Sequence, residues 1–151
     1  MKRNRLTVLL LLLVVLVTAF IFSNSLKNGE ESVADSDAII ALIEPLIEKI
    51  FGEEHQIDLN YIVRKSAHLA EFFLLGALTS CLILDLKRRH GKHLRGYEFF
   101  YVLAVAVADE YIQSFTGRTS MVADILIDFL GAILGFGTVF LIFAWRRRKK
   151  K

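Results

Sequence analysis

Four long apolar stretches alternate along the chain with polar or basic segments. They cover residues 6–22, 66–86, 97–115 and 121–145. A helix needs about 20 mostly apolar residues to cross the hydrocarbon core of a bilayer, and each stretch comes close to that length. The pattern therefore predicts an all-α integral membrane protein in which four helices form a bundle, as a single domain over residues 1–151.

The first apolar stretch follows a short basic head. A cleaved signal peptide is the alternative interpretation, but its apolar region usually has about 7–15 residues and is followed by a small-residue cleavage site. This stretch has 17 residues, and the sequence Phe-Ile-Phe-Ser-Asn-Ser at its end is a poor cleavage site. We therefore expect an uncleaved first transmembrane helix.

Residues 23–64 form a polar connection that contains nine acids and three Lys or Arg residues. Inside it, apolar residues recur at helical spacing over residues 37–51. Ser36 or Asp37 is the expected N-cap, and Pro45 is expected to kink or break the helix. This predicts an outer amphipathic helix, or two short ones, on the bilayer or over the mouth of the bundle. Packing without chemistry is its simplest role.

The basic residues predict the orientation in the membrane. The head at residues 1–5, the loop at 87–95 and the tail at 146–151 hold 14 of the 19 Lys and Arg residues. Short loops rich in Lys and Arg stay cytoplasmic, and four crossings place all three clusters on one side. Both termini are then cytoplasmic, while residues 23–64 and the turn at 114–120 lie outside.

Composition narrows the class of protein further. Apolar residues make up 54% of the chain, and the basic clusters flank apolar stretches instead of forming a nucleic-acid-binding module. The single cysteine, Cys81, excludes an internal disulfide. The third stretch is the weakest of the four, because Glu98, Asp109 and Glu110 interrupt it.

In this topology, ionisable and polar residues from three separate segments reach one membrane depth near the outer surface. Charged groups inside a bilayer are costly, so they usually face a bundle interior or a wet cavity. An interhelical salt-bridge network is the competing interpretation, although such contacts are often worth only about 0.6 kcal/mol each. The residues expected to line one outward-facing, ligand-binding cleft are Lys65, His68, Glu71, Asp109, Glu110, Gln113, Arg118, Ser120, Asp124 and Asp128.

Helical spacing shows which way the fourth stretch faces. Asp124, Asp128, Gly131 and Gly135 are four, three and four residues apart, so they form one stripe along a helix. The acids of this stripe should therefore face another helix instead of lipid. A Gly-x-x-x-Gly pair allows two helices to approach closely, which predicts a packing role for the glycines.

Three uses fit this set of polar groups. They could bind a cationic or polar ligand, or hold a divalent cation through the carboxylates and His68. They could also carry out acid–base chemistry on a lipid-linked substrate, with His68 and Glu110 as the candidate catalytic residues. From the sequence we assign no metal and no cofactor. It contains no nucleotide-binding glycine loop and no activated Ser or Cys nucleophile.

The polar residues of the predicted cleft and the two glycines of the fourth stretch together resemble the pattern of the VanZ-like family of bacterial membrane proteins, over nearly the whole chain. Asp128 stands where many members carry Asn. The matching residues are Lys65-Ser66-Ala67-His68, Asp109-Glu110-Tyr111-Ile112-Gln113, Gly117-Arg118-Thr119-Ser120, Asp124, Asp128, Gly131 and Gly135.

The resemblance implies a multi-pass protein of the bacterial plasma membrane and cell envelope, with a role in resistance to teicoplanin, a lipid-tailed glycopeptide. The expected partners are the lipid bilayer and a cell-wall lipid intermediate or lipoglycopeptide, without nucleic acid. Our first hypothesis is a non-enzymatic protein with a ligand-binding cleft. The alternatives are a small membrane enzyme acting on a lipid-linked phosphate or saccharide, with Lys65 and Arg118 as phosphate clamps, and an ion- or proton-coupled carrier.

Overall fold

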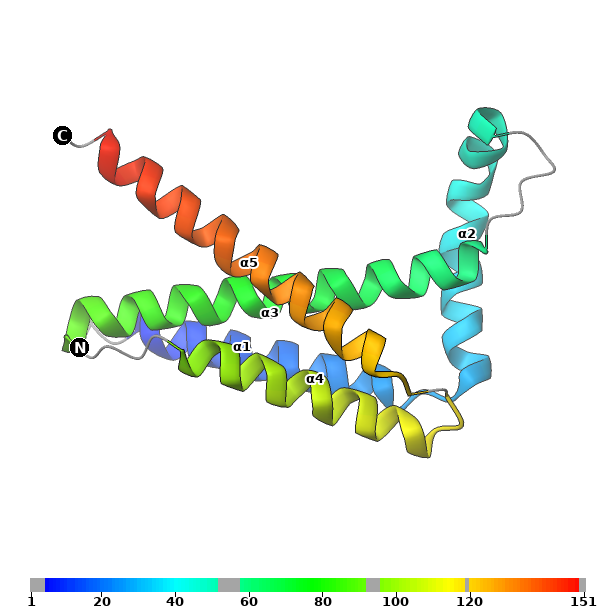
Figure 1. Ribbon diagram of the computed structural model, residues 1–151, viewed down its shortest axis with the longest axis horizontal. Helices are drawn as coiled ribbons and strands as arrows, with labels where there is room; N and C mark the ends of the chain where they lie inside the picture. The colour runs from blue at the N-terminus through cyan, green and yellow to red at the C-terminus, as the bar shows by residue number, and fades with distance from the viewer. Residues whose placement is uncertain (1–4, 52–57, 92–95, 119, 150–151) are drawn as a thin grey trace.

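The computed structural model describes residues 5–51, 58–91, 96–118 and 120–149, and over these ranges it contains five α-helices and no strand. This confirms the all-α prediction. Figure 1 shows α1, α3 and α4 running alongside one another, with α5 crossing α3 and α2 standing across one end of the molecule. The helices are α1 (Arg5–Ser25), α2 (Gly29–Phe51), α3 (Leu59–His90), α4 (Tyr97–Phe115) and α5 (Val122–Arg148).

Three of the helices in the described part of the chain are long and apolar enough to cross a membrane, namely α1, α3 and α5. They correspond to three of the four predicted spans. The fourth prediction, residues 97–115, has the bounds of α4, which is not among these three and carries the acids Glu98, Asp109 and Glu110. Asp109 and Glu110 are buried in the structure, so these acids do not face the surroundings of the protein.

One hydrophobic core joins α1, α3, α4 and α5. Burying apolar side chains in this way is the main favourable contribution to packing in water, whereas in lipid close van der Waals contact takes that role. Phe72 and Leu75 place α3 at the centre of this core with no exposed surface. The core residues are Val14, Ile21, Phe72, Leu75, Val102, Val105, Ala106, Ala132 and Phe136.

Helices α3 and α5 approach each other closely because α5 carries glycines at the contact. A methyl group added to Gly131 would overlap the backbone of Leu69, and one added to Gly135 would overlap the backbone of Phe73. Both glycines are buried. The structure thus confirms the prediction that the Gly-x-x-x-Gly pair permits close backbone approach.

Helix α2 begins earlier than the apolar spacing predicted. The expectation that Ser36 or Asp37 caps it is wrong, because the helix already starts at Gly29. Asn28 forms a capping box there: its side chain accepts a hydrogen bond from the Glu31 backbone N–H at 2.8 Å, and Glu31 accepts one from the Asn28 N–H at 3.1 Å. Pro45 lies inside a single helix of 23 residues and does not divide it.

A second, small core attaches α2 to the beginning of α3. Ile40 of α2 is buried against Leu59 and Val63 of α3. On another side of α2, large apolar residues have no cover within the described residues: Leu42 is 81% exposed and Leu46 is 61% exposed. The helix thus has apolar residues both on its packed side and on its exposed side.

Helix α3 is longer than the predicted second span. It begins at Leu59 because the Asp58 carboxylate accepts a hydrogen bond from the Tyr61 backbone N–H, and it ends before Gly91, which adopts the left-handed conformation typical of a C-cap. Residues 87–90 are therefore helical and are not part of the loop predicted over 87–95. At 32 residues, α3 is about 48 Å long.

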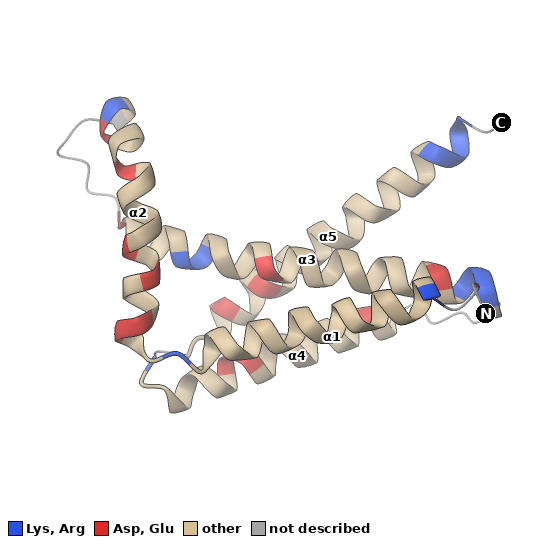
Figure 2. Ribbon diagram, turned by 180° about the vertical axis from the view of Figure 1, so that it is seen from behind, with Lys and Arg blue, Asp and Glu red and all other residues tan. Residues whose placement is uncertain are grey.

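Charge is unevenly distributed between the two ends of the molecule. Figure 2 shows acidic residues along α2 and basic residues at the ends of α3 and α5 that lie away from it. At this basic end, Asp85 pairs with Arg89 at 2.7 Å and accepts a hydrogen bond from Thr7 of α1 at 2.6 Å. Parts of the basic head, loop and tail lie outside the described residues.

Candidate functional site

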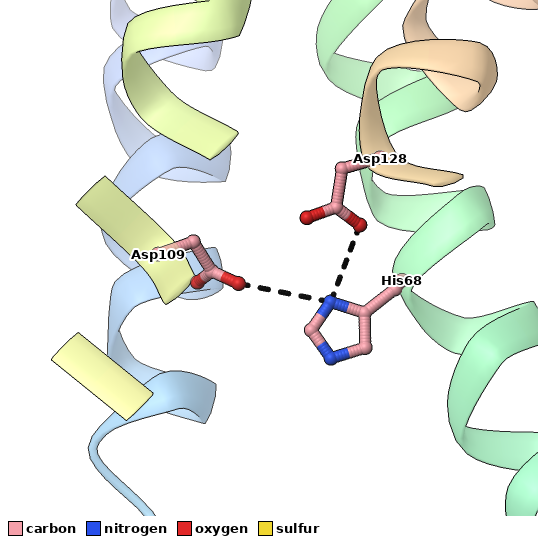
Figure 3. Close-up of side chains that lie close together, drawn as sticks. All are labelled: His68, Asp109 and Asp128. Atoms are coloured by element: carbon pink, nitrogen blue, oxygen red, sulfur yellow. Dashed lines mark ion pairs between the residues drawn. The ribbon is translucent and has the colours of Figure 1, made fainter. Parts of the chain in front are cut away.

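Side chains from three helices meet at His68. Figure 3 shows the Nδ1 atom of the His68 ring between the carboxylates of Asp109 and Asp128. Nδ1 lies 3.7 Å from Asp109 Oδ2 and 3.4 Å from Asp128 Oδ1. The sequence predicted that α3, α4 and α5 deliver polar groups to one depth, and here these three residues lie together.

Asp109 is fully buried and well satisfied. Ser25 of α1 donates a hydrogen bond to Asp109 Oδ1, and the Gln113 side-chain amide donates one to Oδ2 at 2.7 Å. Ser25 and Gln113 are also buried, with at most 2% of their surface exposed. All four helices of the main core therefore contribute a polar group around His68, and their hydrogen bonds fix the orientation of the Asp109 carboxylate.

Asp128 has no such support. It is fully buried, and in the described part of the structure neither of its carboxylate oxygens has a hydrogen-bond partner. The His68 Nδ1 atom lies 3.4 Å from Asp128 Oδ1, which is too long for a strong ion-pair hydrogen bond. A buried carboxylate without partners is costly, so this residue requires a physical explanation.

Two of the predicted residues form an ion pair that links α3 to α5. Lys65 donates to Asp124 Oδ1, with 19% of the Lys65 side chain and 9% of the Asp124 side chain exposed. This pair agrees with the interpretation of these two charges as part of an interhelical salt-bridge network. It leaves Lys65 with its carboxylate partner close by, instead of free to act as a phosphate clamp.

Glu110 reaches from α4 to the beginning of α5. Its Oε2 atom accepts a hydrogen bond from the Met121 backbone N–H at 3.0 Å, at a helix terminus where the N-cap residue itself provides no side-chain hydrogen bond. Carboxylates stabilise helix N-termini by accepting from free N–H groups and by opposing the helix dipole. Glu110 thus has a structural role beside the catalytic role for which the sequence made it a candidate.

A cavity of about 410 Å³ lies between α1, α2, α3 and the turn that follows α4. Of the predicted cleft residues, His68, Glu71 and Arg118 line it. Glu71 accepts a hydrogen bond from Asn24 of α1 at 2.7 Å. The wall also contains apolar residues, including Phe20 and Ile39, so the cavity is both polar and apolar.

Two arginines share this cavity. In the described residues, the Nε atoms of Arg64 and Arg118 are buried and have no hydrogen-bond partner. Burial lowers the pKa of the Arg118 guanidinium below its usual value, and the nearby positive charge of Arg64 lowers it further. Arg118 Nη2 also lies 3.5 Å from His68 Nε2, at the long limit for a hydrogen bond.

The predicted set is therefore divided between two places. His68, Glu71 and Arg118 line the cavity. Lys65, Asp109, Glu110, Gln113, Asp124 and Asp128 lie outside its wall and between helices, and Ser120 is exposed.

Sequence reasoning missed part of the wall. Asn24 and Ser25 follow the first apolar stretch, and Arg64 directly precedes the Lys65-x-x-His68 motif. The polar sequence Ser-Asn-Ser after residue 22 was the available signal. Helix α2 contributes Ser32, Asp35 and Ser36 to the same wall, which its predicted role as a packing element did not include.

The fold and the buried polar centre define a class: a small, all-helical protein with three helices able to cross a membrane and ionisable residues between them. Within that class, the family model described as VanZ/LLP1 matches residues 8–144. The chain therefore belongs to the VanZ/LLP1 family, as the resemblance indicated. Neither the curated proteins nor the solved structures contain a match to it.

Proposed function

We propose that this VanZ-family membrane protein binds the anionic head group of a cell-envelope lipid in the cavity between α1, α2 and α3. The observation that carries the proposal is the pair of guanidinium groups, Arg64 and Arg118, that line the cavity with unpartnered Nε atoms. Two neighbouring, partly buried cations repel each other, and an anion between them would relieve both the repulsion and the lost hydration. Arginine is well suited to phosphate, because its planar fork donates two hydrogen bonds.

The composition of the cavity supports a lipid in particular. Phe20, Ile39 and Val63 provide apolar wall beside the arginines, as an acyl or polyprenyl chain next to a phosphate would require. Helix α2 borders the cavity with its polar side chains, while Leu42 and Leu46 on its exposed side suit the membrane interface. We infer that α2 is the predicted outer amphipathic helix.

The proposed orientation places four helices across the bacterial plasma membrane, with both termini in the cytoplasm. Basic residues at the ends of α3 and α5 opposite α2 support it, because such residues remain cytoplasmic. Helix α4 completes the bundle, since its buried acids do not contact lipid. Single cysteines at Ser120 and Lys149, in a Cys81→Ser chain, test this: only the former should react with an impermeant thiol reagent in intact cells.

The binding experiment compares a polyprenyl phosphate with the same polyprenol without phosphate, using purified protein in nanodiscs. Wild type should bind the phosphate form, and Arg64→Gln combined with Arg118→Gln should lose most of this preference. Arg89→Gln is the matched control, because Arg89 pairs with Asp85 outside the cavity. Equal binding of the two lipids, or an unchanged preference in the double variant, would refute the proposal.

The position of His68 favours one second candidate function. His68 lines the same cavity beside Arg118, so a bound phosphate ester would have a potential general base or acid close to it. The protein would then be a small enzyme acting on a lipid-linked phosphate or saccharide. Product analysis of the bound lipid after incubation separates the two: turnover that His68→Gln abolishes indicates the enzyme, and an unchanged lipid indicates a binding protein.

The family resemblance adds a physiological role to this proposal. A protein that sequesters or alters access to an envelope lipid at the outer surface would reduce the action of a lipid-tailed glycopeptide such as teicoplanin. This part of the proposal rests on the family and on the cavity together.

A further inference from the structure

We propose that His68, Asp109 and Asp128 bind a single divalent transition-metal ion, with Zn²⁺ as the best-fitting candidate. The three residues come from α3, α4 and α5 and can each offer one ligand atom, all within 4.8 Å of one another. The proposal concerns His68 and the two carboxylates near its Nδ1 atom, and it does not depend on which ligand occupies the neighbouring cavity.

The spacing of the three residues suits an ion better than a direct ion pair. The His68 Nδ1 atom is 3.4 Å from Asp128 Oδ1 and 3.7 Å from Asp109 Oδ2, so both carboxylates approach the ring without forming a close hydrogen bond to it. Zinc binds nitrogen and carboxylate oxygen at about 2.0–2.2 Å, and tetrahedral ligands at that radius lie about 3.3–3.6 Å apart. The two gaps measured from His68 Nδ1 are close to this range.

Asp128 provides the independent observation that points to a ligand. It is fully buried, and both of its oxygens lack hydrogen-bond partners among the residues that the structure describes. Figure 3 shows one of these oxygens directed at the His68 ring nitrogen. A divalent cation would satisfy this carboxylate and would neutralise the two negative charges of Asp109 and Asp128 together.

The surroundings of Asp109 resemble the support that metal ligands usually have. Ser25 and Gln113 each donate a hydrogen bond to one of its oxygens, which fixes the carboxylate and leaves further lone pairs free. Such outer contacts orient a ligand and tune its affinity for the metal. Because Ser25 and Gln113 provide such contacts to Asp109, they strengthen the assignment of its Oδ2 atom as a ligand atom.

The donor set selects the class of metal. Imidazole with carboxylates suits zinc, iron or manganese, whereas Ca²⁺ requires six to eight oxygen ligands. Three protein ligands leave one zinc position open for water or another group. Binding at Nδ1 would place the ring proton on Nε2, so Arg118, now 3.5 Å from Nε2, would have to turn away from the ring.

The test uses a chain in which the other three histidines are replaced by alanine, His55→Ala, His90→Ala and His93→Ala, and which carries no histidine tag. After chelation, zinc affinity is measured in detergent by competition with a chromophoric chelator. We expect one zinc per chain, and a loss of affinity of more than about 100-fold in His68→Ala and Asp128→Asn. This exceeds the roughly 10–100-fold loss typical of outer contacts.

Three further variants define the site. Gln113→Ala should lower zinc affinity by about 10–100-fold, because it removes a support of Asp109. Glu98→Gln and Asp85→Asn should leave the affinity unchanged, since they replace acids outside the three that lie towards the basic end of the molecule. Equal affinity in wild type and Asp128→Asn, or no zinc binding at all, would overturn the proposal and would favour a protonated His68 between two carboxylates.

X-ray absorption at the zinc edge provides a readout that needs no change to the three residues. In the chain lacking the other histidines, any imidazole in the zinc coordination shell must be His68. The expected shell has nitrogen and oxygen neighbours at about 2.0–2.2 Å with one imidazole. A shell without imidazole would mean that zinc binds elsewhere, which contradicts the proposal even if a variant fails to fold.

Discussion

The contact between α3 and α5 allows a sharp test of how the structure is held together. In Gly135→Ala, the added methyl group would overlap the Phe73 carbonyl and the Ala77 backbone nitrogen, so the two helices must move apart. Gly137 lies two residues further along α5 and has no atom within 4 Å of the position where a methyl would be added. The variants Gly135→Ala and Gly137→Ala therefore make the same chemical change, but only the first places a methyl group against neighbouring atoms.

The magnitude follows from two opposing terms. Overpacking at a close contact costs about 1–3 kcal/mol. Replacing glycine by alanine within a helix is favourable by up to about 1 kcal/mol, and this term is common to both variants. Gly135→Ala should therefore unfold at a free energy about 1–3 kcal/mol lower than Gly137→Ala, which should match or exceed wild type.

The assay is equilibrium unfolding in mixed detergent micelles, followed by circular dichroism. The single cysteine, Cys81 of α3, provides a second probe, because a thiol-reactive dye reports its exposure as the helices separate. If the two variants unfolded at the same free energy, the close approach of α3 and α5 at Gly135 would be wrong.

Three further predictions concern the polar contacts. Lys65→Met should lower the free energy of unfolding by about 1–3 kcal/mol, which is less than the roughly 3–5 kcal/mol of a fully buried pair because the Lys65 side chain is still 19% exposed. The double variant Lys65→Met with Asp124→Leu should recover most of this loss. A double-mutant cycle measures the coupling between the two residues, and additive effects of the two substitutions would exclude it. Asn28→Ala should destabilise the first turn of α2 by about 1 kcal/mol, seen as faster amide hydrogen exchange there and not in α3; unchanged exchange would contradict the capping box. Glu110→Ala should lower the free energy of unfolding by about 1 kcal/mol, and Glu110→Gln should lower it less, because the Gln amide oxygen can still accept the hydrogen bond from the Met121 N–H. A larger loss in Glu110→Gln than in Glu110→Ala would show that the carboxylate charge has another role.

Much of the fold could be predicted because apolar length and spacing are strong signals. The bounds of three predicted apolar stretches agree with those of helices α1, α4 and α5 to within a few residues, and the stripe of glycines on α5 faces α3 as expected. The beginnings of α2 and α3 were missed because capping by Asn28 and Asp58 depends on local side-chain geometry, and this extends both helices into polar sequence. Pro45 lies inside α2 without dividing it, so of the two effects expected of this residue, a kink or a break, the break does not occur.

The candidate site could be predicted only in part. Helical spacing shows which residues share a face and topology shows which share a depth, and this was enough to bring His68, Asp109 and Asp128 together. It does not show which partner each side chain chooses. The pairing of Lys65 with Asp124 depends on how α3 packs against α5, and the presence of Arg64 in the cavity depends on how α2 packs against α3. Spacing along one helix reveals neither.

The most direct test of the proposed function is the concentration of teicoplanin that kills a Gram-positive host. It is measured with no protein, with wild type, with Arg64→Gln plus Arg118→Gln, and with Arg89→Gln, all at matched levels in the membrane. We predict that wild type and Arg89→Gln raise this concentration and that the double variant does not. If no chain raised it, or if the double variant protected as well as wild type, the proposed role of the cavity in glycopeptide resistance would be wrong.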